Sequence, residues 1–559
     1  MSIIKFCSLG GLGEVGKNMS VVEVDDKIFI LDAGLKFPSA KLYGIESVIP
    51  DFEYLITNAN KIQGVFVSHG HLEHCGAITA LVKELNIPIY CSYFTLSLLR
   101  EELKEAGFKE NEYKLLRVHD NSKIKFDDVT IEFFRTTHSI PDSIGINICT
   151  EDGIITYIPD FTFRSVSNPI YRTSFDKIGE LAHRNVLMVC PESLGVNDYD
   201  RVTSDIVFEQ AISDILTTSK RVLFSMYATD LSRIQQVIDL SVKHNRRIAL
   251  LGRKAQRNIS VAMDIGYLKI PTNNFVSLKF MDDRNQNDYD DLVVIIAGHR
   301  HEPYFMVHRM ATGKDKLIRV NNQDTVVMVS PPVIGTERLA SRTIDTLYKL
   351  DAKVINISKK MLVGSHANGE DLKLLYQMIN PKFILPIAGE YRHQYAQRDV
   401  AESAGFTKDK IIMLSNGEQV TFRDGDLIPA VKKVPSGDVL IDGSLVGDIN
   451  ELVIRDREIL SEAGTVSTIA VINSKTKQIV SRPRVVTKGF MTGGIDSELE
   501  TKIVNLTMNM IFDFFEKKSK EDVNDLRNNI RDSITRLIRK TVHMHPIVIS
   551  AIIDTIEEE

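Results

Sequence analysis

The chain has 559 residues, which is too long for a single hydrophobic core and predicts three or four domains. Its composition, with 43% hydrophobic and 25% charged residues, is typical of a soluble globular protein. No apolar run approaches the roughly 18 residues that a membrane helix needs, and the N-terminus lacks the pattern of a signal peptide, so we expect a cytoplasmic protein without a membrane anchor. The five cysteines form no Cys-x-x-Cys pair, which argues against a disulfide framework and against thiolate zinc sites. The net charge of −6 excludes an overall attraction to nucleic acid, so binding of that kind would require a local basic groove.

The first 200 residues are expected to alternate short strands with turns and a few helices. A glycine-rich turn at residues 10–16 precedes two strands, at residues 20–24 and 27–31, that meet in a hairpin at residues 25–26. The glycine turn resembles a dinucleotide-binding fingerprint, but it leads into a strand and not into a helix, so we discard a cofactor role for it. The second strand of the hairpin ends at Asp32, which leaves a carboxylate at its tip.

The segment 68–74, Ser-His-Gly-His-Leu-Glu-His, places three imidazoles and a carboxylate within six residues. An apolar, β-branched segment precedes it and predicts a buried strand, so the polar side chains lie where a strand ends. His69 and His71, two residues apart in an extended backbone, can share one metal ion, whereas Glu73 and His74 turn toward a neighbouring position. Three of the chain's 14 histidines in so short a run are hard to attribute to chance. The segment is therefore a candidate two-metal site.

Further strands are expected at residues 88–92, 129–135 and 154–158, and the last two are followed by His138 and Asp160. From about residue 204 the pattern changes to alternating helices and strands, which predicts a parallel sheet with crossover helices. The strands expected in this part span residues 221–225, 247–251, 292–297, 353–357 and 383–387.

Around residues 431–442 the pattern loosens into a Lys/Pro/Ser/Gly stretch that is typical of a linker. A final unit follows, with two strands and two helices. Its last helix, at residues 522–541, carries five basic residues, which either form a solvated face or contact a partner or RNA.

Taken together, Asp32, the segment 69–74, His138 and Asp160 resemble the motifs of the metallo-β-lactamase fold: an acid after a strand, His-x-His-x-Asp-His, a distant His and a distant Asp. The parallel α/β insert resembles the β-CASP insertion of the members that process nucleic acids. The chain is similar to the ribonuclease J family nearly from end to end, and to the second of its paired paralogues in particular. Four segments carry this closer resemblance, at residues 10–19, 31–38, 389–392 and 455–460.

The resemblance implies an α/β fold made of a metallo-β-lactamase αββα sandwich, an inserted parallel α/β β-CASP domain and a small α+β C-terminal domain. We expect the first part of the sandwich at residues 1–204, the β-CASP domain at 205–357, the second part of the sandwich at 358–430, a linker at 431–449 and an association domain at 450–559.

The resemblance also implies a metal-dependent phosphodiesterase of RNA processing and decay, which acts as a 5′-to-3′ exonuclease and sometimes as an endonuclease. Two divalent ions would neutralise the charge that gathers on the scissile phosphate. Ligands of imidazole and carboxylate suit zinc or manganese, and the sequence does not choose between them. Carried over from the family, one ion would be held by His69, His71 and His138 and the other by Glu73 and His74; Asp160 would bridge both, Asp32 would orient ligands and water, and Glu73, His74, Asp160 and His366 would be catalytic.

Two departures from the family pattern weaken the second ion's site. Glu73 stands where the family has Asp, and its extra methylene displaces the carboxylate by about 1.5 Å. Ala388 stands where the family usually has the His that completes this site, and alanine cannot bind a metal. Because even the loss of a group behind a ligand costs about 10–100-fold in metal affinity or activity, we expect a weak or empty second site and low hydrolytic activity. Compensation by water or by the longer reach of Glu73 is the alternative.

The residues expected to recognise RNA lie in the insert and just after it. The segment Leu362, Val363, Gly364, Ser365 and His366 resembles the family's phosphate-binding loop, His-Val-Ser-Gly-His, and implies a pocket for a 5′-monophosphate. Leu362 replaces a histidine and Gly364-Ser365 stand in swapped order, which puts the affinity of the pocket in doubt. Ser232 and Glu192 also stand where the family often has His and Asp. A basic groove for RNA phosphates could include Arg233, Arg253, Arg246, Arg247, Lys254 and Arg257, although solvated charge is the alternative for each of them.

We therefore expect a ribonuclease of low activity that works with an active paralogous ribonuclease J subunit on single-stranded, 5′-monophosphorylated RNA. The C-terminal unit would promote association with the paralogue or with further copies, giving a homo-oligomer or a mixed assembly. A non-catalytic RNA-binding or structural subunit is the main alternative. A small-molecule hydrolase of the same superfamily, such as a thioesterase or lactonase, is disfavoured because such enzymes need neither the insert nor the C-terminal domain.

Overall fold

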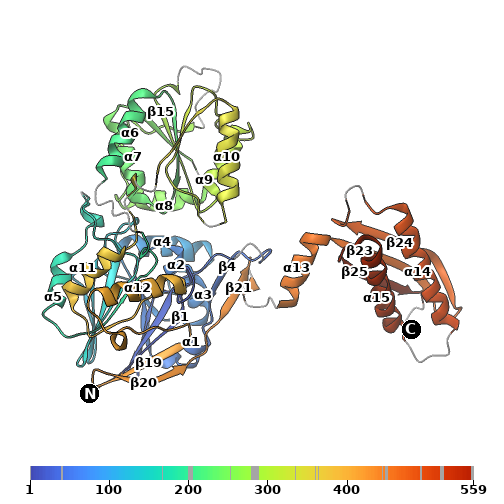
Figure 1. Ribbon diagram of the computed structural model, residues 1–559, viewed down its shortest axis with the longest axis horizontal. Coiled ribbons are helices and arrows are strands. Elements are labelled where there is room, and N and C mark those ends of the chain that lie inside the picture. Colours follow the sequence, from blue (N-terminus) through green and yellow to red (C-terminus); the bar gives the residue numbers. More distant parts are fainter. Residues whose placement is uncertain are drawn as a thin grey trace. The chain divides into compact units, whose positions relative to one another are not determined.

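The computed structural model describes residues 2–38, 42–166, 168–198, 205–251, 253–278, 289–333, 335–358, 361–362, 364–443, 445–446, 451–491, 494–516 and 522–555. The chain forms two compact units, of which the first comprises Met1–Phe37 and Val48–Val439 and the second comprises Pro38–Ser47 and Leu440–Glu559. The first unit contains a domain of two sheets and a domain of one parallel sheet (Figure 1).

The two-sheet domain has one core between the inner faces of its sheets. Phe29, Phe66, Ile146 and Tyr157 come from both sheets and are almost fully buried in this core. The first sheet runs in the order β20 (Asp426–Lys433), β19 (Glu418–Arg423), β1 (Ile3–Gly10), β2 (Met19–Val24), β3 (Lys27–Leu31), β5 (Ile62–Val67), β6 (Pro88–Cys91) and β7 (Lys114–Arg117). The second runs in the order β18 (Phe383–Ile384), β12 (Val186–Pro191), β11 (Gly153–Ile158), β10 (Ile144–Thr150), β9 (Val129–Arg135) and β8 (Lys123–Phe126).

Helices cover the outer faces of both sheets. Strands β5, β6 and β7 are parallel, so the connections between them need crossover helices, which are α2 (Leu72–Cys75) and α3 (Ile78–Glu84) and then α4 (Tyr93–Glu105). The second sheet packs its outer face against α5 (Phe175–Leu181), α11 (Gly369–Ile379) and α12 (Tyr391–Ser403). The expected αββα sandwich is thus present. Strand β4 (Ser47–Pro50) and helix α1 (Glu53–Thr57) lie between β3 and β5 in the sequence.

The direction of the strands gathers polar side chains at one end of the sandwich. Strand β3 is parallel to β5, and β11 is parallel to β12. The residues that follow these strands therefore leave each sheet at the same edge, which is where α/β proteins place their sites. Asp32, Ser68, Asp160 and Glu192 all occupy such positions.

The second domain of this unit is a sheet of five parallel strands with helices on both faces (Figure 1). Strand β15, Leu-Val-Val-Ile-Ile-Ala-Gly, is buried throughout, as a central parallel strand must be. The strand order is β14 (Arg247–Leu251), β15 (Leu292–Gly298), β13 (Val222–Tyr227), β16 (Thr325–Met328) and β17 (Lys353–Asn356). Helices α6 (Ile206–Thr218), α7 (Leu231–Lys243) and α8 (Arg253–Asp264) pack on one face, and α9 (Glu302–Ala311) and α10 (Glu337–Lys349) pack on the other. The parallel α/β insert expected from the sequence is therefore present.

The segment expected as a linker contains strands. Strand β20 continues to Lys433 because it pairs antiparallel with β19, as far as Lys433 opposite Glu418. Strands β21 (Asp438–Asp442) and β22 (Leu445–Val446) follow and pair with each other. The Pro/Ser/Gly composition that suggested a linker thus marks only the short connection between β20 and β21.

The second unit has a three-stranded sheet with two long helices on one face. Helix α15 begins after Asp522, whose side chain accepts hydrogen bonds from two backbone N–H groups, and it buries Leu526, Ile530, Ile534 and Ile538 at a spacing of four residues. The elements are α13 (Glu451–Ala463), β23 (Thr465–Asn473), β24 (Gln478–Lys488), α14 (Ser497–Glu516), α15 (Val523–Val542) and β25 (Ile547–Asp554), and the sheet order is β24, β23, β25. Across the described residues of both units, every helix falls short of the length or the apolarity needed to cross a bilayer.

Candidate metal centre

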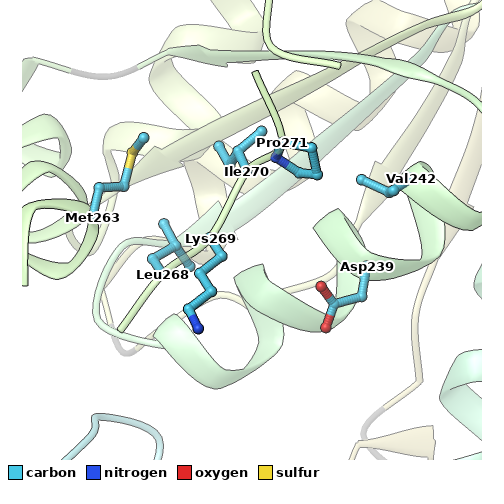
Figure 2. Close-up of a pocket in the computed structure, with 7 residues that line it drawn as sticks. All are labelled: Asp239, Val242, Met263, Leu268, Lys269, Ile270 and Pro271. Atoms are coloured by element: carbon cyan, nitrogen blue, oxygen red, sulfur yellow. The ribbon is translucent and has the colours of Figure 1, made fainter. Parts of the chain in front are cut away.

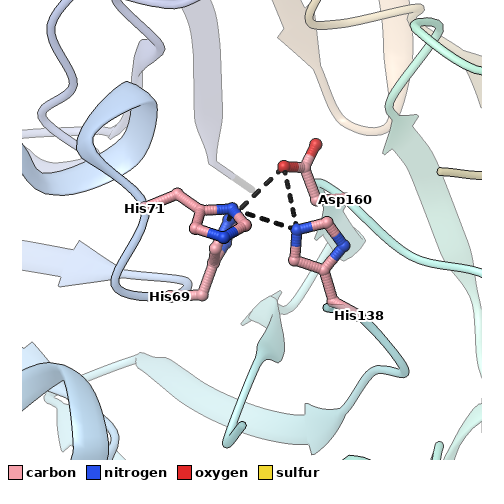
Figure 3. Close-up of side chains that lie close together, drawn as sticks. All are labelled: His69, His71, His138 and Asp160. Atoms are coloured by element: carbon pink, nitrogen blue, oxygen red, sulfur yellow. Dashed lines mark hydrogen bonds and ion pairs between the residues drawn. The ribbon is translucent and has the colours of Figure 1, made fainter. Parts of the chain in front are cut away.

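Four of the side chains predicted as metal ligands converge at the end of the two-sheet domain (Figure 3). His69 and His71 follow β5, His138 follows β9 and Asp160 follows β11. Nδ1 of His71 lies 3.1 Å from Nε2 of His69 and 3.1 Å from Nε2 of His138. Oδ2 of Asp160 lies 3.3 Å from Nε2 of His69 and 3.5 Å from Nε2 of His138.

These spacings fit one metal ion. A tetrahedral ion with ligand bonds of about 2.0–2.1 Å separates neighbouring ligand atoms by about 3.3 Å. The four measured separations lie between 3.1 and 3.5 Å. All four ligand atoms lie within 4.8 Å of one another, so the set is close enough together to hold one metal ion.

The outer nitrogen of each imidazole has a hydrogen-bond acceptor, which points the lone pair of the other nitrogen inward. His138 donates its Nδ1–H to the carbonyl oxygen of Ser365 over 2.7 Å, and His71 uses Nε2 toward the carbonyl oxygen of Thr229 at 3.4 Å. The hydroxyl of Ser68 gives its one hydrogen to Asp32, so its oxygen accepts from Nδ1 of His69 at 3.0 Å. Three lone pairs that face one another at about this spacing repel unless a cation lies among them.

The charges of the site are also those of a metal-binding set. Burial lowers the pKa of His69 to about 3 and also lowers the pKa values of His71 and His138. These imidazoles are therefore neutral, which is the form that binds metals. Burial opposes ionisation of Asp160, but the neighbouring His74 and His366 outweigh it and hold the pKa of this carboxyl well below its usual range.

The second set of ligands expected from the sequence is not assembled. Nε2 of His74 lies 3.4 Å from Oδ2 of Asp160, but it also lies 3.2 Å from the amide nitrogen of Asn18. Among the described residues, two groups of ligand atoms lie close together around Asp160, and Glu73 belongs to neither of them. Ala388 is buried and offers only its carbonyl oxygen, which accepts a hydrogen bond from the backbone of Ser193.

Asp32 connects several elements around the site. Its carboxylate accepts hydrogen bonds from Nδ1 of His74 at 2.7 Å, from the backbone N–H of Ser68 at 2.7 Å and from the hydroxyl of Tyr157 at 2.9 Å. Sequence reasoning missed Tyr157, although its position on β11, three residues before Asp160, was a usable signal. Asp32, Asp160 and Ala388 all have positive φ angles, of 62°, 36° and 51°, a conformation that Asp adopts more readily than most residues and that is uncommon for alanine.

The other group around Asp160 consists of Glu192 and His366. Glu192 is fully buried, and its Oε1 accepts hydrogen bonds from the backbone of Phe161 at 2.7 Å and of Ala367 at 3.0 Å. Its Oε2 accepts from Nδ1 of His366 at 2.7 Å. Burial opposes a proton on His366, but the charges of Glu192 and Asp160 outweigh it and hold the pKa of this imidazole well above its usual value. His366 is thus anchored at the edge of the metal centre with one nitrogen fixed and the other available.

Comparison with known proteins connects this arrangement to one family. Residues 31–189 match the beta-lactamase superfamily domain, residues 219–347 match the beta-CASP domain of ribonuclease J and residues 452–555 match the C-terminal domain of ribonuclease J. Ribonuclease J2 of Bacillus subtilis is 33% identical over 552 residues, which cover 99% of this chain and 98% of that protein. The chain belongs to the ribonuclease J family.

Further relatives agree with this assignment. Ribonuclease J 2 of Streptococcus pyogenes is 32% identical over 555 residues, which cover 99% of this chain and all of that protein. A crystal structure of a protein of unknown function from Enterococcus faecalis is 15% identical and has a TM-score of 0.52 over 75% of this chain and all of that chain, which is a likeness of fold alone. The expected fold class is confirmed: the two-sheet domain is the metallo-β-lactamase domain, and the five-stranded insert is the β-CASP domain.

The residues of the loop expected to bind a 5′-phosphate lie in different surroundings. Leu362 packs against the apolar core of the β-CASP domain, and Val363 lies outside the described residues. A Cβ atom at Gly364 would have one neighbour within 4 Å, the carbonyl oxygen of His366 at 3.7 Å, so the space around this glycine is open. Ser365 orients His138 through its carbonyl oxygen, which ties the loop to the metal centre.

Three of the arginines expected to line an RNA groove, Arg233, Arg246 and Arg247, have protein partners. Arg233 is buried, donates to Oδ1 of Asp205 over 2.7 Å and stacks on the ring of Phe208 at 4.4 Å, so a phosphate would have to displace this acid. Arg246 donates to backbone carbonyl groups, and Arg247 pairs with Asp291. The side chain of Arg253, the first residue of α8, lies outside the described part of the chain, and so do those of Lys254 and Arg257.

A surface pocket of about 450 Å³ lies elsewhere on the β-CASP domain, between α7, α8 and residues 268–271 (Figure 2). Its lining is mostly apolar and includes one acid, Asp239, and one base, Lys269. None of the residues predicted to bind metal or RNA contributes to it. This pocket and the candidate metal centre are therefore separate sites.

Proposed function

We propose that this chain is a metal-dependent ribonuclease of RNA processing and decay with low hydrolytic activity of its own. The observation that carries the proposal is one complete set of four ligands, His69, His71, His138 and Asp160, beside an incomplete second set. The family of the chain supports RNA as the substrate class. The incomplete set supports low activity, because phosphodiester hydrolysis in two-metal sites depends on two ions that stabilise the attacking and the leaving oxygen.

The complete set would hold one zinc or manganese ion, with Glu73 and His74 left as weak ligands for a second. A bound ion would supply Lewis-acid chemistry, lowering the pKa of a water molecule and polarising a phosphoryl oxygen. Ser68, Thr229 and Ser365 would keep the three imidazoles in the tautomers that present their lone pairs to the ion.

His366 would act on protons at the scissile phosphate. Glu192 fixes Nδ1 of this imidazole and favours its protonated form, which leaves Nε2–H to donate to a phosphate oxygen or to the leaving ribose oxygen. Asp160 would bind the ion through Oδ2, while its other oxygen, Oδ1, lies 3.5 Å from Nδ1 of His366. The pairing of a buried acid with a partly exposed imidazole supports the role of general acid.

The substrate would be single-stranded RNA with a 5′-monophosphate, cleaved mainly from the 5′ end and sometimes internally. The loop that contains Gly364 and Ser365 would receive the phosphate through its backbone N–H groups. Because Leu362 packs into the core and Arg233 is paired with Asp205, we expect weaker selection of the 5′ phosphate than the family pattern would give.

We further propose that the chain assembles through its C-terminal unit with further copies and with an active paralogue. Helices α14 and α15 cover one face of the three-stranded sheet, and the other face carries side chains that are apolar and exposed. An open apolar face of this kind is typical of an association surface. The exposed apolar residues on its strands are Ile469, Val480, Val486, Ile549 and Ile553.

A non-catalytic RNA-binding or structural subunit is the second candidate function, and the incomplete second ligand set is the observation that favours it. Single-turnover cleavage of a 5′-monophosphorylated RNA, with zinc and manganese compared, separates the two. We expect slow cleavage that disappears with His69→Ala while RNA binding persists. RNA binding without cleavage under either metal would favour the structural subunit, and a chain that neither binds nor cleaves RNA would overturn the proposal.

A further inference from the structure

Arg300 lies in the turn between β15 and α9, beside the ends of the β-CASP strands that border the metal centre. Strand β15 ends at Gly298, whose carbonyl oxygen accepts a hydrogen bond from the backbone N–H of Ala228 at 3.0 Å. The next residue along that strand end, Thr229, meets the metal ligand His71 through its carbonyl oxygen at 3.4 Å. The turn that carries Arg300 thus adjoins a strand end that reaches the metal centre.

The guanidinium group of Arg300 stacks on an aromatic ring of the metallo-β-lactamase domain. Its carbon atom Cζ lies 4.7 Å from the centre of the ring of Phe37. Two residues before Phe37, the backbone N–H of Leu35 donates to the carbonyl oxygen of Leu72 over 2.9 Å. The stack therefore joins the two domains next to the metal-binding run at residues 69–74.

No acid within the described part of the chain neutralises this arginine. Among those residues, the guanidinium group of Arg300 has the ring of Phe37 as its partner and forms neither an ion pair nor a hydrogen bond. Glu302, two residues further on, accepts a hydrogen bond from the backbone N–H of His299 at 2.9 Å. The ring covers one face of the guanidinium group, so the N–H groups at its edge remain for a ligand.

The chemistry of this position suits a phosphate of an RNA chain. A guanidinium group presents several N–H donors in one plane, which matches two oxygens of a phosphate, and an aromatic ring can support it from one face. Arg233 would have to leave Asp205 before it could bind a phosphate, whereas Arg300 has no acid to leave among the described residues. Arg300 is therefore better placed for RNA than the arginine that the sequence suggested.

We propose that Arg300 binds a backbone phosphate of the RNA close to the scissile phosphate, with Phe37 holding its guanidinium group in place. The inference rests on the proposed function, since it takes single-stranded RNA as the substrate. In the contacts of the described residues, Arg300 touches none of the four ligands of the complete set. It therefore positions the RNA and leaves the metal ion unaffected.

The test measures the affinity for a 5′-monophosphorylated, single-stranded RNA at several salt concentrations. Stopped-flow fluorescence anisotropy with a 3′-labelled RNA records binding before cleavage. We expect Arg300→Ala to weaken binding about tenfold, which is the effect of losing one charge-assisted phosphate contact. Each such contact to a single strand contributes about 0.7 to the slope of log affinity against log salt concentration, so this slope should become shallower by about 0.7. The number of metal ions per chain should not change.

Two conservative variants separate the charge from the geometry. Arg300→Lys keeps the charge without the planar group, and Phe37→Leu keeps the arginine without the ring. Both should retain the salt slope of the wild type, and Phe37→Leu should weaken binding about twofold to fivefold, the effect of one cation–π contact at a partly exposed site. Arg309→Ala is the matched control, because it removes an arginine of α9 that pairs with Asp315 at 3.5 Å. It should change neither the affinity nor the slope.

A set of RNAs, each with one phosphate replaced by an uncharged methylphosphonate, locates the contact. We expect one replacement to weaken binding by the wild type about as much as Arg300→Ala does. The same replacement should have no further effect on binding by Arg300→Ala, because the two changes remove the same interaction.

Equal RNA affinity and equal salt slope in the wild type and in Arg300→Ala would overturn the inference. If Arg300→Ala then lowered only the free energy of unfolding, Arg300 would merely join the two domains. In both cases the wild-type chain still binds RNA, so the proposed function stands. A wild-type chain that does not bind the RNA would overturn the proposed function and the inference with it.

Discussion

His74 donates its Nδ1–H to Oδ2 of Asp32 over 2.7 Å, and neither side chain is more than 1% exposed. The same carboxylate accepts from Ser68 and from Tyr157. Strands β3, β5 and β11 and helix α2 are thereby joined at one buried acid. The geometry of the metal centre therefore depends on a residue that need not touch the metal.

Replacing Asp32 with Asn should weaken both the fold and the metal centre. The amide removes the charge and turns one acceptor into a donor that faces donors, so we expect the free energy of unfolding to fall by about 2–4 kcal/mol. Metal affinity should fall by about 10–100-fold. Urea denaturation and calorimetric metal titration measure these effects. Asp26→Asn, at an exposed carboxylate that pairs only loosely with Lys27, is the control and should change neither quantity.

Removing one imidazole of the complete set should abolish binding of the first ion. His69→Ala deletes a fully buried ligand, and the remaining three cannot close a tetrahedral site without water. Elemental analysis of the purified protein should find less than one ion per chain, and RNA cleavage should be lost. His183→Ala, at an exposed histidine outside the site, should retain the ion and the activity. Metal retained by His69→Ala would place the ion elsewhere.

Changing Glu192 to Gln should slow the chemical step without removing the metal. Oε1 of Glu192 already serves two backbone N–H groups, so the new amide nitrogen would face Nδ1 of His366 and take away its anchor. We expect kcat to fall by about 10–100-fold with little change in KM, as for loss of a general acid. Glu209→Gln, on the exposed side of α6, is the matched control. A fall in metal content instead would show that Glu192 acts on the ion.

Charged substitutions on the open face of the C-terminal sheet should reduce association. Ile549 and Ile553 are both about half exposed and lie on β25, so Lys at both positions would place two charges on the apolar face that we propose for association. Light scattering should show fewer protomers per assembly. Val207→Lys changes a similarly exposed residue on α6 and should leave the number unchanged. An unaltered assembly in the double variant would locate association on another surface.

Much of the fold could be predicted because its signals are local. The hairpin at residues 25–26 and the limits of β14 follow from turn residues and the apolar pattern, and the structure has both where the sequence predicts them. The run at residues 69–71 was predicted as part of a metal site from the sequence itself, whereas His138 and Asp160 were added through the resemblance to the ribonuclease J family. The structure brings these four side chains together.

Other features depend on contacts between distant parts of the chain. Arg233 looked available for RNA, but Asp205 and Phe208 occupy its guanidinium group, and no local pattern reveals such partners. Glu73 stands beside His74 in the sequence, yet it does not join the ligand atoms around Asp160. Asn18 reaches His74 across 56 residues of sequence. Residues 38–47 belong to the compact unit of the C-terminal part, where Arg457 donates to the carbonyl oxygen of Tyr43.

The domain limits that we expect at residues 204, 357, 430 and 449 stay predictions. The compact units divide the chain elsewhere, between Phe37 and Pro38, between Ser47 and Val48 and between Val439 and Leu440. Local composition suggested a linker, whereas strand pairing between β19 and β20 extends the sheet into it.

The most direct test is to count the divalent ions bound to the pure wild-type chain and to time its cleavage of a 5′-monophosphorylated RNA in the same sample. With zinc or manganese at a slight excess, we predict one tightly bound ion per chain and slow turnover that increases when Ala388 is replaced by His. Two tightly bound ions together with fast turnover by the wild-type chain would contradict the account.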